Sequence, residues 1–235
     1  MSDIQLLPDP PQAPESFPEA RLTGQKPPLK PREVRAIRVR LQIEAKRRDL
    51  ALSNLAIDSK LRSCDLVPLR VSDVVTGGSV RERVVIIQQK TGRPVQFALT
   101  EPTRRAVSAW VTRRPWDEKG YLFPSRVHGR PHLSTRQYAR IVSQWVASIG
   151  LDPHKYGTHS LRRTKAAQIY KATGNLRAVQ LLLGHTMPES TIRYLGVGIE
   201  DALQISERLE LWVVGGGSAV LVLPRLDNQG RAIFR

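Results

Sequence analysis

THSLRRTKAAQIYKATGNLRAVQLLLGHTMPESTIRY, residues 158–194, is the stretch of sequence from which the fold can be predicted most directly. Its apolar residues recur at the spacing of amphipathic helices. Thr158 and Asn175 are suited to cap the first turns of two successive helices. Gly184 is suited to end the second one, because glycine readily adopts a left-handed backbone. With a short helix expected over residues 189–194, the stretch predicts three consecutive helices.

Four side chains in this stretch have the chemistry needed to bind and attack a phosphate group. His159 and Arg162 lie on one face of the first helical turn, where backbone N–H groups attract anions and a guanidinium can contact two phosphate oxygens. His185 follows the end of the second helix, and Tyr194 closes the stretch. Each residue alone also fits an ordinary role, such as a solvated arginine, a histidine cap or a buried tyrosine. From the residues alone, the functional and structural interpretations are about equally favoured.

The charge of the chain points to a polyanionic partner. The 235 residues include 37 Lys and Arg against 21 Asp and Glu, a net charge of +16. Nucleic acid is favoured, because neutralising phosphates releases counterions. No apolar run approaches the roughly 20 residues that span a bilayer, and the first residues, MSDIQLLPDPPQ, do not resemble a signal peptide. Cys64 is the only cysteine, which excludes an intrachain disulfide and a cysteine-rich zinc site. A cytoplasmic setting is expected.

Composition divides the chain into three parts. Residues 1–31 contain eight prolines and are expected to form a disordered or extended arm. Residues 32–211 carry the periodic patterns of a folded domain. Residues 212–235 begin near the flexible sequence Gly-Gly-Gly-Ser and predict either a small hairpin or an exposed apolar tail.

Outside the quoted stretch, the patterns predict a mainly α fold with a small antiparallel β-hairpin. A β-branched run makes residues 83–89 a buried-type strand, and residues 94–99 alternate as the returning strand. Lys90 lies at the tip of the turn between them, where by default it is an exposed lysine. Further helices are expected over residues 31–45, 49–60, 100–113, 134–149 and 200–209, with a short helical turn within residues 61–74.

The assembled residues resemble the catalytic domain of the tyrosine recombinases, the phage integrase family. Members carry an Arg, a Lys, a His-x-x-Arg, a second His or Trp, and a Tyr, in that order. The sequence HSLRR matches the third element through His159 and Arg162, and LLLGHT matches a Leu-Gly-His pattern through His185. Tyr194 follows His185 by nine residues, the usual spacing in the family. This part of the resemblance is highly specific, because four residue types and their spacing coincide.

Two upstream positions complete the resemblance, which covers roughly residues 31–209. LRSCDLVPLRVSDV resembles the box of the first arginine and identifies Arg62, with Asp65 where the family usually has Glu. Lys90 falls on the hairpin that carries the family's lysine. Many members have an N-terminal helical domain that completes a clamp around DNA, whereas only about thirty proline-rich residues precede the domain here. The chain therefore resembles the short recombinases that consist of a catalytic domain alone.

The resemblance implies a site-specific DNA recombinase, an integrase or an invertase, that acts without metal, ATP or any other cofactor. Tyr194 is the implied nucleophile and forms a 3′-phosphotyrosyl link with release of a 5′-hydroxyl. Neighbouring cations are expected to lower the pKa of its phenol, which is about 10 in water. The implied roles of the other residues are phosphate binding for Arg62, Arg162 and His185, proton acceptance for His159, and proton donation to the leaving oxygen for Lys90.

Partners follow from the same resemblance. Double-stranded DNA is the expected substrate, with a homo-tetramer during strand exchange, a possible accessory DNA-binding protein, and no membrane. Residues 200–209 are a candidate for a helix that docks into a neighbouring subunit, although packing on their own core is as well supported. The expected location is the bacterial cytoplasm, on the nucleoid. Two alternatives remain open: a site-specific DNA-binding regulator without activity, and an enzyme that relaxes supercoils as type IB topoisomerases do.

Overall fold

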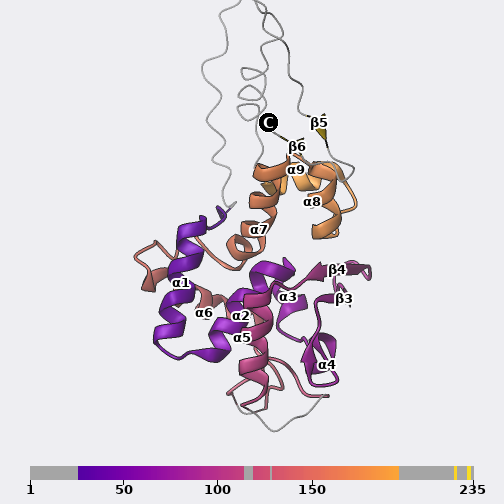
Figure 1. Ribbon diagram of the computed structural model, residues 1–235. Helices are drawn as coiled ribbons and strands as arrows, with labels where there is room; N and C mark the ends of the chain where they lie inside the picture. The colour runs from indigo at the N-terminus through magenta and orange to yellow at the C-terminus, as the bar shows by residue number, and fades with distance from the viewer. Residues whose placement is uncertain (1–25, 114–118, 128, 196–224, 227–231, 234–235) are drawn as a thin grey trace, which may run out of the picture. The chain divides into compact units, whose positions relative to one another are not determined.

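Helices form most of the structure, which is a computed structural model that describes residues 26–113, 119–127, 129–195, 225–226 and 232–233 (Figure 1). The chain divides into two units, residues 1–196 and 197–235. Strands in the described part form two-stranded antiparallel pairs. The predicted mainly α fold with a small antiparallel hairpin is confirmed. No helix among the described residues is long and apolar enough to cross a membrane.

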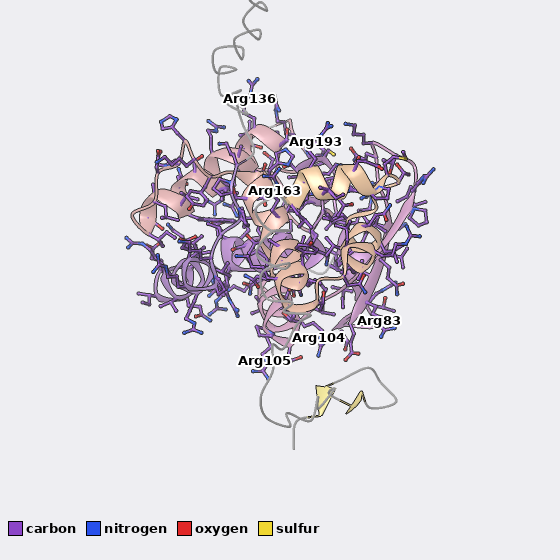
Figure 2. All side chains as sticks on the ribbon, turned by 90° about the horizontal axis from the view of Figure 1, so that it is seen from above. Arg83, Arg104, Arg105, Arg136, Arg163 and Arg193 are labelled. Carbon is purple, nitrogen blue, oxygen red and sulfur yellow. The ribbon has the colours of Figure 1, made fainter. Side chains whose placement is uncertain are left out.

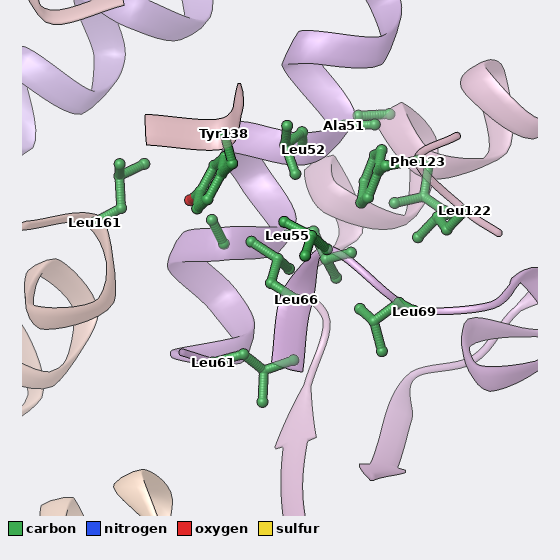
Figure 3. Packing of buried hydrophobic residues seen from close by; sticks show 14 of the residues in the cluster. Ala51, Leu52, Leu55, Leu61, Leu66, Leu69, Leu122, Phe123, Tyr138 and Leu161 are labelled. Carbon is green, nitrogen blue, oxygen red and sulfur yellow. The ribbon is translucent and has the colours of Figure 1, made fainter. Parts of the chain in front are cut away.

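A central helix, α2, organises the first unit. Its residues Leu52 and Leu55 are fully buried, and it packs against α1, α5 and α7 (Thr158–Thr173). Figure 3 shows these leucines in the main apolar cluster, together with Leu66, Tyr138 and Leu161 from other elements. Elements far apart in the sequence are thus joined around α2. The helices that bound this core are α1 (Pro31–Ile43), α2 (Arg47–Ser59), α5 (Glu101–Val111) and α6 (Thr135–Ser148).

Short elements connect α2 to α5, and the two longest strands among them, β3 and β4, form an antiparallel hairpin just before α5. Val84 faces Phe97 on the buried side of this hairpin, whereas Val85 and Ile87 are 57% and 69% exposed. The expectation of a buried-type strand is therefore wrong in part, because the two-stranded ribbon is covered on one face only. The elements are α3 (Ser63–Leu66), α4 (Val71–Val74), β1 (Val75–Thr76), β2 (Ser79–Val80), β3 (Arg83–Ile87) and β4 (Pro94–Ala98).

Three consecutive helices follow α6, as the quoted stretch predicts. Asn175 caps the second, because its Oδ1 accepts a hydrogen bond from the Ala178 N–H at 2.9 Å. Thr158 is not a cap, since it is already the first helical residue and Gly157 occupies the capping position. The bounds are α7 (Thr158–Thr173), α8 (Leu176–Leu183) and α9 (Pro188–Leu195).

Gly184 ends α8 in a conformation and a space that only glycine fits. Its φ is 66°, in the left-handed region. A Cβ placed there would lie 2.5 Å from Cγ2 of Val95 on β4. The end of α8 therefore lies directly on the hairpin.

In the second unit, the structure describes two short strands. β5 (Arg225–Leu226) pairs antiparallel with β6 (Ala232–Ile233). The helix expected over residues 200–209 lies outside the described residues, as does most of the proline-rich arm.

Candidate active site

Arg162 is buried, although a charged residue in a helix is by default solvated. Its side chain extends from the start of the second turn of α7 into the core, and the residue is 3% exposed. Nη1 donates to the carbonyl of Lys60 at 2.6 Å, and Nη2 donates to the carbonyl of Leu183 at 3.0 Å. These carbonyls lie at the ends of α2 and α8, so the guanidinium ties three helices together. Its orientation is fixed by backbone atoms rather than by flexible partners.

Arg62 is positioned at the start of α3, beside the hairpin. Its Nη1 donates to Oε1 of Gln88 at 2.9 Å and lies 4.0 Å from Oδ2 of Asp65. Asp65 also accepts a hydrogen bond from the Gln89 N–H, so the same carboxylate holds the hairpin. Burial is the largest cause that lowers the pKa of Arg162. Arg62 lies close enough that its positive charge lowers this pKa further.

Tyr194 lies among cationic and aromatic groups on α9. The Cζ atoms of Arg163 and Arg162 lie 4.7 Å and 5.6 Å from the centre of its ring, and the His185 ring meets it edge-on at 5.3 Å between centroids. Its hydroxyl oxygen is buried and makes no hydrogen bond of ordinary geometry. α9 is held by a small apolar cluster that includes Val179.

The expectation of a lowered phenol pKa is wrong for this structure. Burial raises the pKa of Tyr194, and it outweighs the nearby positive charges of Arg162 and Arg163, which favour the phenolate. His185 adds no positive charge at neutral pH, because burial, followed by the charges of Arg162 and Arg62, lowers its pKa to about 4. The phenol is therefore protonated at neutral pH in this state.

The two histidines are both held in the neutral form. Nδ1 of His185 lies 3.2 Å from the hydroxyl of Thr191, a buried residue of α9, which orients the ring. His159 keeps much of its surface exposed in the first turn of α7. Partial desolvation and then the charge of Arg162 lower the pKa of His159. Neutral imidazoles can accept a proton, which protonated ones cannot.

Lys90 lies apart from this group. It is exposed in the turn between β3 and β4, as its position in the sequence predicts. Across residues 26–113, 119–127 and 129–195, no hydrogen bond or ion pair joins Lys90 to the other candidate residues. The structure thus brings together Arg62, His159, Arg162, His185 and Tyr194 and leaves Lys90 at the edge.

Sequence reasoning missed three residues that build the site. Gln88 is a fully buried amide that binds Arg62. Lys60 has a left-handed backbone, with φ 55°, and supplies a carbonyl to Arg162. Arg163 follows Arg162, and the doublet is visible in the sequence, but its contact with Tyr194 is tertiary. Nothing in the local pattern distinguishes Gln88 or Lys60 from solvated residues.

A buried carboxylate supports the frame next to Lys60. Asp58 accepts hydrogen bonds from the Thr100 N–H at 2.8 Å, from Thr103 Oγ1 at 2.6 Å and from Lys165 Nζ at 2.6 Å. Burial alone raises the pKa of Asp58, but these donors outweigh it and the pKa is lowered. The carboxylate therefore joins α2, α5 and α7 as an ion.

The group as a whole suits a phosphodiester better than a metal. Among the described residues, no cluster of three or more His, Cys, Asp or Glu is placed to hold a metal ion. The guanidiniums of Arg162 and Arg163 and the neutral imidazole of His185 instead lie against the phenol of Tyr194. Guanidiniums bind phosphate oxygens in pairs, and a phenol can attack phosphorus.

Comparisons with known proteins agree with this chemistry. The chain matches the phage integrase family over residues 28–198. The probable integrase/recombinase YoeC of Bacillus subtilis (strain 168) is 30% identical over 151 residues, which are 64% of this chain and 78% of YoeC. Tyrosine recombinase XerD of Xanthomonas axonopodis pv. citri (strain 306) is 29% identical over 201 residues, 82% of this chain. The chain spans 63% of the length of that XerD.

Solved structures show the same fold. The crystal structure of XerA recombinase matches with a TM-score of 0.62 at 19% identity, over 86% of this chain and 66% of that one. The XerH site-specific recombinase bound to a palindromic difH substrate matches with a TM-score of 0.60 at 20% identity, over 78% of this chain and 54% of that one. With most of its sequence matched and its fold shared, the chain belongs to the phage integrase family of tyrosine recombinases.

Proposed function

We propose that this protein is a site-specific DNA recombinase that breaks and rejoins DNA strands through a covalent phosphotyrosyl intermediate. The observation that carries the proposal is the position of Tyr194, whose ring lies against Arg162, Arg163 and His185. An ordinary core tyrosine would be surrounded by apolar side chains and would satisfy its hydroxyl. A nucleophile for a phosphodiester needs the cationic surroundings found here.

In the proposed reaction, the Tyr194 oxygen attacks the scissile phosphorus and the bond from phosphorus to the 5′-oxygen breaks. The products are a 3′-phosphotyrosyl link and a 5′-hydroxyl. Arg62 and Arg162 hold the non-bridging oxygens, and the neutral His185 donates a hydrogen bond to the phosphate. Because the new ester conserves the energy of the broken one, a different 5′-hydroxyl can reverse the step without ATP.

Two proton transfers balance the reaction. The raised pKa of Tyr194 means that its proton must leave during attack rather than before it. His159 is neutral near pH 7 and lies at the start of α7, so it is our candidate acceptor. Lys90 is our candidate donor to the 5′-oxygen, which requires its exposed turn to close on bound DNA. General acid–base assistance of this kind contributes about 100- to 10,000-fold.

The distribution of charge supports DNA as the substrate. Figure 2 shows Arg136 and Arg193 on one side of the molecule and Arg104 and Arg105 on the opposite side. Arg104 and Arg105 are paired with Glu101. Arg136 is exposed at the start of α6 and makes no ion pair with any described residue. Uncompensated arginines around α6 and α9 suit the phosphate backbone.

The remaining parts of the proposal concern organisation. We propose that residues 32–211 act as the catalytic domain, preceded by an arm at residues 1–31 and followed by a tail at residues 212–235. Strand exchange between two duplexes needs four such subunits, so a homo-tetramer on DNA is proposed. An accessory DNA-binding protein and a place on the bacterial nucleoid are proposed with it.

A plasmid assay tests the function. Two copies of the DNA that flanks the coding gene are cloned into one supercoiled plasmid. The plasmid is incubated with purified protein in the absence of metal and ATP. Deletion or inversion of the intervening segment is expected, and Tyr194→Phe should abolish it. Relaxation of a plasmid that lacks the flanking DNA would instead favour topoisomerase activity, and specific binding without any strand exchange would favour a regulator.

A further inference from the structure

Gln88 is a buried polar side chain at the point where the hairpin meets the helices of the site. It directly follows β3 and is 0% exposed. Its Oε1 accepts from Arg62 Nη1 at 2.9 Å and from Thr91 Oγ1 at 2.9 Å, and its Nε2 donates to the Leu183 carbonyl at 3.4 Å. Both polar atoms of the amide are therefore in use. Buried amides are costly unless satisfied in this way.

The amide links the two arginines of the site through one shared acceptor. The Leu183 carbonyl receives Nη2 of Arg162 as well as Nε2 of Gln88. On the other side, Oε1 of Gln88 receives Arg62. Two oxygens with partial negative charge thus lie between two guanidiniums that would otherwise repel each other. The spacing of the arginines depends on the Gln88 side chain.

The same residue closes the turn that carries Lys90. The Gln88 N–H donates to the Arg93 carbonyl at 2.9 Å, and the Gly92 N–H donates to the Gln88 carbonyl at 2.8 Å. The Thr91 hydroxyl then binds the Gln88 side chain from the residue next to Lys90. Through these bonds, Gln88 fixes the position of the Lys90 turn relative to Arg62 and to the end of α8.

Close packing between Gly184 and the Gln88 amide fixes how α8 lies against the hairpin. A Cβ at Gly184 would lie 3.2 Å from both polar atoms of the Gln88 amide. The glycine thus lets α8 approach the amide. His185 follows immediately, so the amide also lies beside the turn that presents this histidine.

From these contacts we infer that Gln88 is a positioning residue, which holds the Lys90 turn and Arg62 in place relative to Arg162. The inference rests on the proposed recombinase function. Gln88 touches no reacting atom in this arrangement. Its loss should slow strand cleavage at saturating DNA and leave the affinity for DNA nearly unchanged, because the side chain is buried away from solvent.

The test compares two leaving groups. Single-turnover cleavage is measured on a nicked substrate with an ordinary phosphodiester and on one whose bridging 5′-oxygen is replaced by sulfur. A 5′-thiolate leaves without a proton, so the sulfur substrate does not need the Lys90 donor. Gln88→Met, which keeps the length of the side chain and removes its hydrogen bonds, should lose about 100-fold on the oxygen substrate and about tenfold or less on sulfur.

Two matched variants distinguish a loss of positioning from a general loss of folded structure. Gln89→Met, at the exposed neighbouring residue, should cleave both substrates at wild-type rates. Gln88→Glu loses the long bond to the Leu183 carbonyl but keeps an oxygen that accepts from Arg62 and from Thr91, the residue next to Lys90. Its ratio of oxygen to sulfur rates should therefore stay close to wild type even if Gln88→Met folds poorly. The melting temperature of each variant is measured alongside.

Three results would each overturn the inference. The first is wild-type cleavage of the oxygen substrate by Gln88→Met. The second is an equal loss on both substrates by Gln88→Met. The third is the same change of the oxygen-to-sulfur ratio in Gln88→Glu as in Gln88→Met. If wild-type protein itself forms no covalent product on either substrate, the proposed function fails instead, and the two failures are distinguishable.

Discussion

Lys60 carries a buried charge whose effect on stability depends on pH. It ends α2 and is 3% exposed, and its Nζ donates to the Asp58 carbonyl at 2.6 Å. Burial, and then the charge of Lys165, lower the pKa of Lys60 from 10.5 to about 8. We predict that the stability of wild type relative to a Lys60→Met variant rises as the pH is raised from 7 to 9.

The magnitude follows from linkage between protonation and folding. A base whose pKa is lowered by folding opposes folding while it is protonated. For Lys60 the penalty is nearly full below about pH 8 and disappears as the pH rises past 10.5. At about 1.4 kcal/mol for each pKa unit, the penalty is about 3 kcal/mol at pH 7. It is smaller by about 1 kcal/mol at pH 9.

Urea unfolding followed by circular dichroism measures the free energy of unfolding of both proteins at pH 7, 8 and 9. Taking the difference between them cancels the titration of other groups. Lys171→Met, at an exposed position of α7, controls for the loss of one positive charge. A difference between wild type and Lys60→Met that stays constant from pH 7 to 9 would refute the reasoning.

Three other predictions test the frame around Arg162 and His185. Gly184→Ala should cost about 2–4 kcal/mol in thermal unfolding, from left-handed strain and overpacking on Val95. Gly174→Ala has similar φ but open space, so it should cost about 1 kcal/mol, and equal losses would contradict the packing argument. Arg162→Lys keeps the charge but cannot reach both carbonyls, so single-turnover cleavage should fall about 100-fold, and wild-type speed would count against it. The His185 ring should show no protonation step above about pH 5 by NMR, since its pKa is about 4. A protonation step near pH 6.5 would show that burial does not lower the pKa of His185.

Local signals predicted the helices of residues 158–194. Asn175 and Gly184 act where expected, because a cap and a left-handed terminus depend on few neighbours. The prediction for Thr158 failed by one residue. The chain enters α7 through an extended Gly157, whose N–H donates to the hydroxyl of Ser160.

Tertiary contacts explain what the sequence could not predict. The carbonyl of Lys60 that holds Arg162 is 102 residues away along the chain. The direction of the Tyr194 pKa shift depends on a balance between burial and charge, and burial is not visible in a list of neighbouring residue types. Gln88 follows an apolar strand as any turn residue would, and its contacts with Arg62 and with the end of α8 are tertiary.

The central claim is that Tyr194 becomes covalently attached to DNA. The most direct measurement uses nicked suicide substrates made from the DNA that flanks the coding gene, followed by denaturing electrophoresis and peptide mapping. The account predicts an adduct that survives denaturation, maps to Tyr194 and is absent from Tyr194→Phe. Folded wild-type protein that binds this DNA specifically and forms no adduct, or forms one at another residue, would contradict it.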